Sequence, residues 1–215
     1  MHLLPKQRGA AALGVALVVL ASPLSAAAEA PLARGALLFR VGDCVGCHTD
    51  KKGGGTPLAV GRPLDTPFGR FYAPNISPDK EYGIGGWSEA EFHRALRDGI
   101  GRGGEHLFPV FPFASYSGMS DDDIAALYAY LQSRPAVATP SKPHDLYFPF
   151  SWRFLMVFWR WLFFSRGPLQ PVARESAEWN RGRYLAEAVA HCQECHTRAM
   201  SWVVARPARP FPAIP

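Results

Sequence analysis

An all-α fold with long connecting loops is what this sequence predicts. Three segments have the pattern of short amphipathic helices, and they start near Pro31, at Ser88 and at Ser120. The chain has 215 residues, of which 20 are glycine and 20 are proline. This proportion is high for a helical protein, and because both residues interrupt helices, we expect Pro- and Gly-rich loops between them.

Residues 1–28 have the features of a secretory signal peptide. Lys6 and Arg8 give a charged start, an apolar run follows over 10–20, and small residues at 25–28 offer a cleavage site. The alternative is a retained membrane anchor, but the apolar run is shorter than the ~20 residues that cross a bilayer. We therefore expect an exported protein.

Each predicted helix has a marked boundary or face. In 31–41, Gly35 and Phe39 lie one turn apart, so another helix can approach closely beside a ring. Ser88 forms a capping box with Glu91, and this helix stops at Gly99. The hydroxyl of Ser120 can cap the third helix, whose first turn is acidic, as the helix dipole favours. The apolar faces of the last two helices consist of Phe92, Ala95, Leu96, and of Ile124, Leu127, Tyr128, Leu131.

Two stretches, 44–48 and 192–196, have the form Cys-x-x-Cys-His and contain all four cysteines. Two thiols at this spacing can add to the vinyl groups of one haem, and the following histidine is placed beneath the iron as its axial ligand. A redox-active dithiol does not need that histidine, a zinc site needs further ligands, and a disulfide is the third alternative. The sequence predicts covalent haem c at both motifs, held by Cys44, Cys47 and His48, and by Cys192, Cys195 and His196.

A haem that transfers electrons normally has a second axial ligand, and a methionine sulfur raises its potential. Met119 is the candidate at the first haem, because it lies 71 residues after His48 in the loop before the third helix. A methionine in such a position is often a core residue. His93 and His106 are the rival ligands, and His93 is expected to be structural or exposed.

An internal repeat accompanies the two motifs. An Arg-Gly pair at 34–35 precedes the first and another at 181–182 precedes the second, with nine and ten residues from the glycine to the first cysteine. The repeat indicates a first haem domain over 29–140, a connecting segment over 141–175 and a partial second domain over 176–215. Only 19 residues follow His196, and Met200 is too near it to reach the opposite face of the iron. The second unit is thus truncated, completed by another chain, or left with an open iron position.

The segment 148–164 is densely aromatic and contains Arg153 and Arg160, which fall on one face of a helix. Seventeen residues with two arginines make a poor membrane-spanning helix. An interfacial helix whose arginines reach the headgroups, a contact surface for a partner subunit, and packing between the haem domains are the open alternatives.

The charge of the chain is modest. The net charge is +5, and it falls to +3 without residues 1–28, when 21 basic and 18 acidic residues remain. Nucleic-acid binding needs a dense basic face, which is not visible, so no nucleic-acid partner is expected. The remaining cations favour an anionic membrane surface or an acidic partner.

Four segments, 61–69, 72–76, 85–88 and 143–146, resemble the multihaem cytochrome c subunit of membrane-bound periplasmic dehydrogenases, which act on alcohols, gluconate or sorbitol. The resemblance covers about 31–197 and implies class I cytochrome c domains, with His48 and Met119 as axial ligands of the first haem. It also implies docking to a catalytic subunit at the periplasmic membrane face. Because family members usually carry three complete haem domains, we expect a chain truncated within the second haem domain.

The expected function is that of an exported electron-transfer cytochrome with no substrate of its own. It would take single electrons from a dehydrogenase catalytic subunit and pass them to quinone or to a downstream cytochrome or oxidase, at the outer face of the inner membrane. The alternative is a dihaem peroxidase-like enzyme whose second haem lacks a sixth ligand, although no distal acid/base pair surrounds His196. A degenerate chain with a passive binding role is the third hypothesis.

Overall fold

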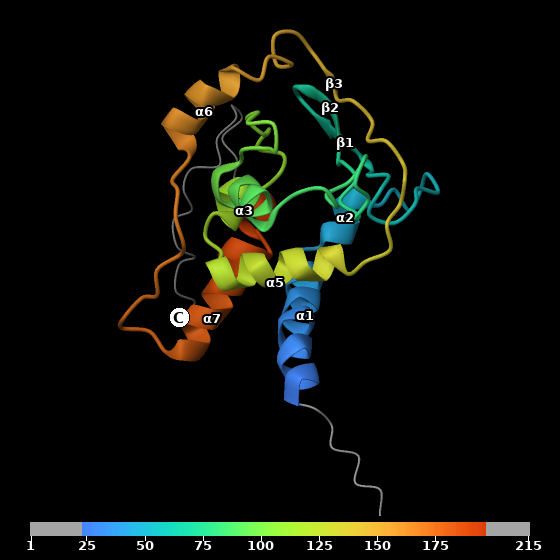
Figure 1. Ribbon diagram of the computed structural model, residues 1–215. Coiled ribbons are helices and arrows are strands. Elements are labelled where there is room, and N and C mark those ends of the chain that lie inside the picture. Colours follow the sequence, from blue (N-terminus) through green and yellow to red (C-terminus); the bar gives the residue numbers. More distant parts are fainter. Residues whose placement is uncertain (1–22, 197–215) are drawn as a thin grey trace, which may run out of the picture.

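The computed structural model describes residues 23–196, and its helices enclose one core (Figure 1). Helix α1 crosses α5, α3 packs beside α5, and the short α2 follows α1 directly. The elements in chain order are α1 (Pro23–Val41), α2 (Cys44–His48), β1 (Pro63–Thr66), β2 (Gly69–Tyr72), α3 (Glu89–Asp98), α4 (Phe113–Tyr116), α5 (Asp121–Gln132), β3 (Asp145–Leu146), α6 (Leu155–Phe163), α7 (Ala177–Tyr184), the π-helix η1 (Leu185–Val189) and α8 (Gln193–His196).

The crossing of α1 and α5 depends on Gly35, as the sequence predicts. A Cβ on Gly35 would lie 2.1 Å from the carbonyl oxygen of Ala126, so only glycine permits this approach. One turn further on, the Phe39 ring packs against Tyr130 with centroids 5.2 Å apart. A partly buried ion pair adds to the contact, because Arg34 of α1, whose side chain is 45% exposed, binds the carboxylate of Asp123, which is 1% exposed.

The capping predictions for α3 and α5 are confirmed. The Ser88 hydroxyl accepts a hydrogen bond from the Glu91 amide, and the Glu91 carboxylate accepts one from the Ser88 amide. Gly99 ends α3 with φ of +61°. The Ser120 hydroxyl accepts a hydrogen bond from the Asp123 amide at the start of α5. The predicted apolar faces point into the core, although Tyr128 is only partly buried.

A small antiparallel sheet, in the order β1-β2-β3, is the feature that the all-α prediction missed. Pro63 pairs with Tyr72, and Arg70 pairs with Asp145. Strands of two to four residues, in a region rich in proline and glycine, carry too few alternating positions to give a periodic signal. Most of the fold is nevertheless helical, as expected.

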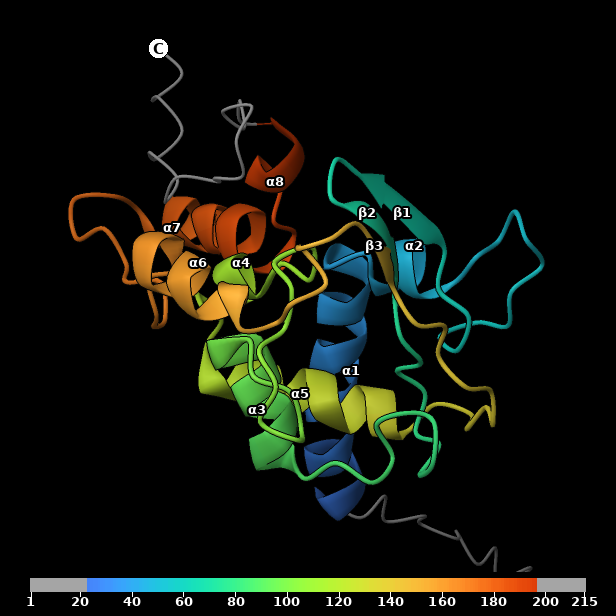
Figure 2. The ribbon, with the colours of Figure 1, turned by 90° about the horizontal axis from the view of Figure 1, so that it is seen from above.

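The segment 141–175 is packed along the first unit. Strand β3 joins the sheet, and the His144 side chain accepts a hydrogen bond from the amide of Tyr72. The chain then runs over α6 and returns through α7 and η1 to α1 and α4 (Figure 2). Val189 of η1 is fully buried in the same core as Leu38 of α1. Within residues 23–196, no helix is long and apolar enough to cross a membrane.

Candidate haem site

The first Cys-x-x-Cys-His motif forms one helical turn directly after α1. The Gly42 amide donates to the carbonyl of Leu38 at 2.8 Å, and Asp43 then turns the chain with φ of +45° so that α2 starts at Cys44. A Cβ on Gly46 would lie 2.2 Å from a carboxylate oxygen of Asp43, so any larger residue here would displace the Asp43 side chain. Both cysteines therefore lie on a short helix whose start is fixed by α1.

His48, the last residue of this helix, is held in one orientation. Its Nδ1 atom lies 2.7 Å from the carbonyl oxygen of Pro74, which can only accept, so Nδ1 carries the proton. Burial lowers the pKa of His48 and favours the neutral ring, against the opposing effect of this hydrogen bond. A neutral histidine whose Nδ1 donates to a carbonyl leaves the Nε2 lone pair available to a metal.

Cys44 of the first motif is a buried thiol that favours its protonated form. Burial raises the pKa of Cys44 to about 12, and the neighbouring Asp43 adds to the effect. A redox-active dithiol needs the opposite shift, toward a stable thiolate. Cys44, Cys47 and Cys192 are free, and no cluster of three His, Cys, Asp or Glu side chains within residues 23–196 could hold a metal ion. Two free thiols beside an oriented histidine fit the donor set of haem c.

Met119 is completely buried, with 1% of its surface exposed, in the core cluster that includes Leu38 and Ile124. Cys44 and Val45 of the first motif pack against the same cluster. Such burial among aliphatic side chains also suits a core methionine, so its role as axial ligand stays a prediction.

The loop that carries Met119 is fixed from two sides. Arg97 of α3, 3% exposed, donates to the carbonyl of Ser117 and, at 2.6 Å, to the carboxylate of Asp121. From the other side, the amide of Leu169 donates to the carbonyl of Gly118 at 2.9 Å. Sequence reasoning missed Arg97, because an arginine in a helix normally indicates a solvated face.

The rival histidines have other surroundings. His93 binds the carboxylate of Asp121 at 2.8 Å, in agreement with the structural role expected for it. The Nδ1 atom of His106 is buried without a hydrogen-bond partner within the described residues, and burial lowers the pKa of this ring. Its carbonyl accepts a hydrogen bond from Arg153 of the segment before α6.

The second motif repeats the local geometry of the first. His191, directly before Cys192, has φ of +43°, close to the +45° of Asp43 before Cys44. The amide of Glu194 donates to the carbonyl of His191 at 2.9 Å, as the amide of Gly46 donates to that of Asp43 at 2.9 Å. This left-handed turn before the first cysteine was not predicted, because neither Asp nor His requires a positive φ.

The π-helix η1 explains the unequal spacing in the two copies. Gly42 donates to the carbonyl four residues earlier, whereas Ala190, at the same distance before its motif, donates to Leu185, five residues earlier. A π-turn accommodates one extra residue in a helix. It therefore takes up the tenth residue between Gly182 and Cys192 and restores the geometry of the turn.

The two copies differ in what covers them. A Cβ on Gly182 would meet no atom within 4 Å, whereas the equivalent Gly35 is covered by α5. His196 is exposed, and in the part of the chain that the structure describes no hydrogen bond holds its ring. Met200 lies outside the described residues. The second motif thus has the turn of the first without its surroundings.

Helix α4 contacts the second motif and lies near the cysteines of the first. The ring of Tyr116 packs against His191, with centroids 5.6 Å apart, and the Ser115 hydroxyl donates to the Glu194 carboxylate at 3.1 Å. Burial raises the pKa of Tyr116 well above its ordinary value, and the nearby Cys44 and Cys47 add to this. Tyr116 therefore borders the first motif and the second.

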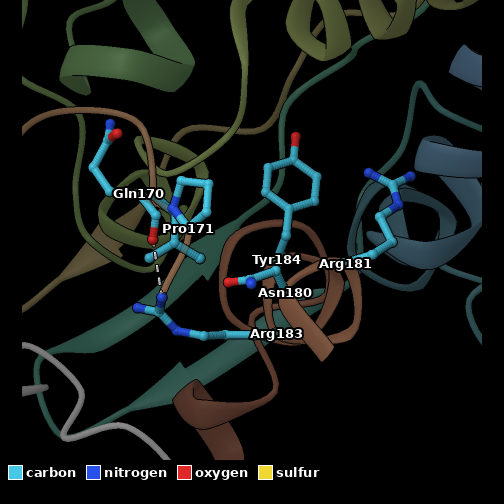
Figure 3. Close-up of a pocket in the computed structure, with 7 residues that line it drawn as sticks. Gln170, Pro171, Asn180, Arg181, Arg183 and Tyr184 are labelled. Atoms are coloured by element: carbon cyan, nitrogen blue, oxygen red, sulfur yellow. Dashed lines mark hydrogen bonds between the residues drawn. The ribbon is translucent and has the colours of Figure 1, made fainter. Parts of the chain in front are cut away.

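A pocket of about 270 Å³ lies elsewhere, between α7 and the loop at 169–171 (Figure 3). Arg183 donates to the carbonyl of Gln170 at 3.1 Å and to the carboxylate of Glu187 at 3.1 Å. Arg181 lies 3.8 Å from the carboxylate of Asp123. Because both guanidinium groups already have anionic or carbonyl partners, this pocket is part of the packing of α7.

Comparison with known proteins agrees with this geometry. Residues 32–135 match the cytochrome c family. The chain is 47% identical to a subunit of the nicotinate dehydrogenase of Pseudomonas putida, over 78% of its own length and 14% of that protein. It is 44% identical to the gluconate 2-dehydrogenase cytochrome c subunit of Pantoea cypripedii, over 79% and 38% of the two chains, and 40% identical to a dihaem cytochrome c of Cereibacter sphaeroides, over 88% and 65%.

These relatives are longer, and the chain spans between 14% and 65% of their lengths. The family match covers the second half of α1 and all of α2, α3, α4 and α5, and therefore contains the first motif and Met119. The free thiols of Cys44 and Cys47 and the oriented ring of His48 are the side chains that such a domain needs to hold its haem. Residues 32–135 of this chain are therefore a cytochrome c domain.

Proposed function

We propose that this chain is an electron-transfer cytochrome that accepts single electrons from the catalytic subunit of a dehydrogenase. It passes them to quinone or to a downstream cytochrome or oxidase, in the periplasm at the outer face of the inner membrane. Cys44 and Cys47 attach one haem c, with His48 and Met119 as axial ligands. Cys192 and Cys195 attach a second, with His196 as its ligand.

The orientation of His48 is the observation that carries the proposal. Haem c, when bound, supplies a one-electron couple, which is the chemistry that a dehydrogenase subunit needs from an electron acceptor. His48 binds the iron through Nε2 because Nδ1 donates to the carbonyl of Pro74. Arg97 holds the loop of Met119, so the sulfur does not have to be ordered when it binds.

The relatives support a dehydrogenase as the electron donor. They include proteins named as cytochrome subunits of gluconate 2-dehydrogenase, fructose dehydrogenase and quinone-dependent alcohol dehydrogenase. Their substrates differ, whereas the cytochrome part is shared. We therefore propose the catalytic subunit of a dehydrogenase as the partner, and that subunit determines the substrate.

Electrons can pass between the two haems along α4. The shared turn geometry supports attachment at the second motif, and Tyr116 borders both motifs. In the described residues, a Cβ on Gly182 would meet no atom within 4 Å, and no hydrogen bond fixes the ring of His196. The second haem is therefore the more exposed of the two. We assign to it the exchange of electrons with another protein or with quinone.

A redox titration of the purified full chain tests this function. We expect reversible uptake of one electron per attached haem and no turnover of peroxide with a reduced donor. Irreversible reduction would contradict the proposal. Steady-state peroxide turnover would establish the dihaem peroxidase alternative in its place.

The role of Met119 is tested by Met119→Leu, which preserves most of the buried volume. We expect the spectral signature of a methionine-ligated low-spin haem to disappear while the helical content remains. An unchanged spectrum would show that Met119 is a core residue only. Met156→Leu is the matched control, because that methionine lies in α6.

A further inference from the structure

The peptide group that joins Pro74 to Asn75 is bound at both of its ends. Its carbonyl oxygen accepts the hydrogen bond from Nδ1 of His48, at 2.7 Å. Its amide donates to the hydroxyl of Ser141, at 2.9 Å. Because both bonds belong to one planar group, each polarises and strengthens the other. His48 is therefore connected, through a single peptide group, to a side chain of the segment that follows α5.

The side chain of Asn75 fixes this peptide group, and Asn75 is only 3% exposed. Its Nδ2 atom donates to the carbonyls of Val137 and Thr139, at 2.8 and 2.9 Å. Its Oδ1 atom accepts a hydrogen bond from the amide of Ser77 at 2.8 Å. Both amide hydrogens and the amide oxygen thus have backbone partners, and these partners allow the side chain a single orientation.

The segment 137–141, which supplies most of these partners, lies outside the family match, because that match ends at residue 135. It belongs to the arc between α5 and β3 at the right of Figure 1. The fully buried Ser77 adds a further contact, since its hydroxyl accepts a hydrogen bond from the amide of Val137 at 3.1 Å. The orientation of His48 therefore depends on residues beyond the matched cytochrome c domain.

We propose that Asn75 and Ser141 are positioning residues for the haem ligand His48, and that they lower the reduction potential of the first haem. The proposal rests on the proposed function, since it needs His48 on the iron, and it names the residues that tune that site. A histidine whose Nδ1 donates firmly to a carbonyl is a more basic ligand, which favours the oxidised iron. Asn75 keeps the Pro74 carbonyl in place, and Ser141 polarises it by accepting from the same peptide group.

Potentiometry of the full chain tests the proposal, with Cys192→Ser/Cys195→Ser present so that only the first haem is attached. Asn75→Leu keeps a branched side chain but loses both donors. We expect the equilibrium constant for one-electron reduction to rise by about threefold, which corresponds to ~28 mV at 59 mV per tenfold change. The measured quantity is the midpoint potential.

Ser141 permits a milder version of this test, because its side chain is exposed and its loss leaves the core intact. Ser141→Ala should raise the midpoint potential by less than Asn75→Leu does, since water can replace the hydroxyl. Ser141→Thr keeps the hydroxyl and should leave the potential unchanged. A role in packing alone would not separate these two variants in this way.

NMR of the reduced, diamagnetic protein measures the His48 ring itself. We expect the Nδ1 proton to exchange with solvent about tenfold faster in Asn75→Leu, because its acceptor is no longer fixed. Asn180→Leu is the matched control. The Nδ2 atom of Asn180 also donates to backbone carbonyls, those of Val172 and Ser176 at 3.0 Å, but it does so at α7. This variant should change neither the exchange rate nor the potential.

Three results would overturn the proposal. They are an unchanged potential and exchange rate in Asn75→Leu, equal changes in Asn75→Leu and Asn180→Leu, and equal potentials in Ser141→Ala and Ser141→Thr. The third comparison decides by itself if circular dichroism shows that Asn75→Leu does not fold. Intact mass reports haem attachment separately. A haem-free chain would contradict the proposed function and this inference with it, whereas an attached haem with unaltered potentials contradicts this inference alone.

Discussion

The first and second Cys-x-x-Cys-His motifs share a turn but differ in nearly everything around it. Both follow a residue with φ near +44°, and both close the turn with an amide–carbonyl hydrogen bond of 2.9 Å. At the first motif, α1 packs closely on α5, and the Pro74 carbonyl binds the His48 ring. At the second, Gly182 in the preceding helix has no neighbouring element against it. The geometry that presents the thiols is thus local, while the orientation of the histidine comes from distant segments.

The two regions are joined at Asp123. Its buried carboxylate binds Arg34 of α1 and accepts a hydrogen bond from the hydroxyl of Tyr184 in α7. Tyr184 also accepts a hydrogen bond from the amide of Ser120 at 3.1 Å. One residue of α5 therefore stabilises the helices that precede both motifs.

Replacing Asp123 with Ala should have the largest effect on this junction. The guanidinium of Arg34 and the hydroxyl of Tyr184 would lose their partner, and we expect the free energy of unfolding to fall by about 3 kcal/mol. Tyr184→Phe removes only the link to the second region and should cost about 1 kcal/mol. Urea denaturation measures both, and equal losses would contradict the shared junction.

Replacing Gly35 with alanine and replacing Gly182 with alanine should change the free energy of unfolding in opposite directions. In Gly35→Ala the new Cβ would clash with the backbone of Ala126, and we expect a loss of about 2 kcal/mol in unfolding free energy. In Gly182→Ala it meets nothing, so the higher helix propensity of alanine should raise stability by ~0.5–1 kcal/mol. A destabilised Gly182→Ala would show that another element covers α7.

The smallest expected effect is a pH dependence confined to the first region. Burial, together with the nearby Arg153, lowers the pKa of His144, whose Nδ1 accepts a hydrogen bond from the Tyr72 amide. As pH falls below ~6.5, the unfolded histidine binds a proton before the folded one. Stability from His144 is therefore complete above that pH and is lost as pH falls through its lower folded-state pKa.

Thermal unfolding of wild type and His144→Gln across pH 5–8 measures this contribution. The glutamine keeps an acceptor but does not titrate, so the difference between the two proteins should grow in favour of the variant toward acid pH. A difference independent of pH would contradict the assignment.

Local signals predicted much of the molecule. Ser88 with Glu91, Gly99 and Ser120 define helix ends through contacts within a few residues, and these boundaries were correct. The close approach at Gly35 followed from its place on the helix face. The cysteine spacing predicted a cytochrome c domain around 44–48, in agreement with the family match over 32–135, while attachment of haem at these residues stays a prediction.

Features that depend on distant contacts could not be predicted from spacing. Pro74 reaches His48 across 26 residues, and Arg97 reaches Ser117 across 20. The inward orientation of Arg153 and Arg160 depends on carbonyls at positions 106 and 98. The hairpin of β1 and β2 was too short to show a pattern, and it is completed by β3, more than 70 residues further on.

The mass of the intact chain, expressed with its N-terminal segment in a host that attaches haem c, tests the central claim that the attachment geometry is local. If a shared turn is sufficient, the protein carries two covalent haems, and Cys192→Ser/Cys195→Ser carries one. A single haem on the unaltered chain, mapped to Cys44 and Cys47, would contradict the claim and show that the surrounding fold is needed for attachment.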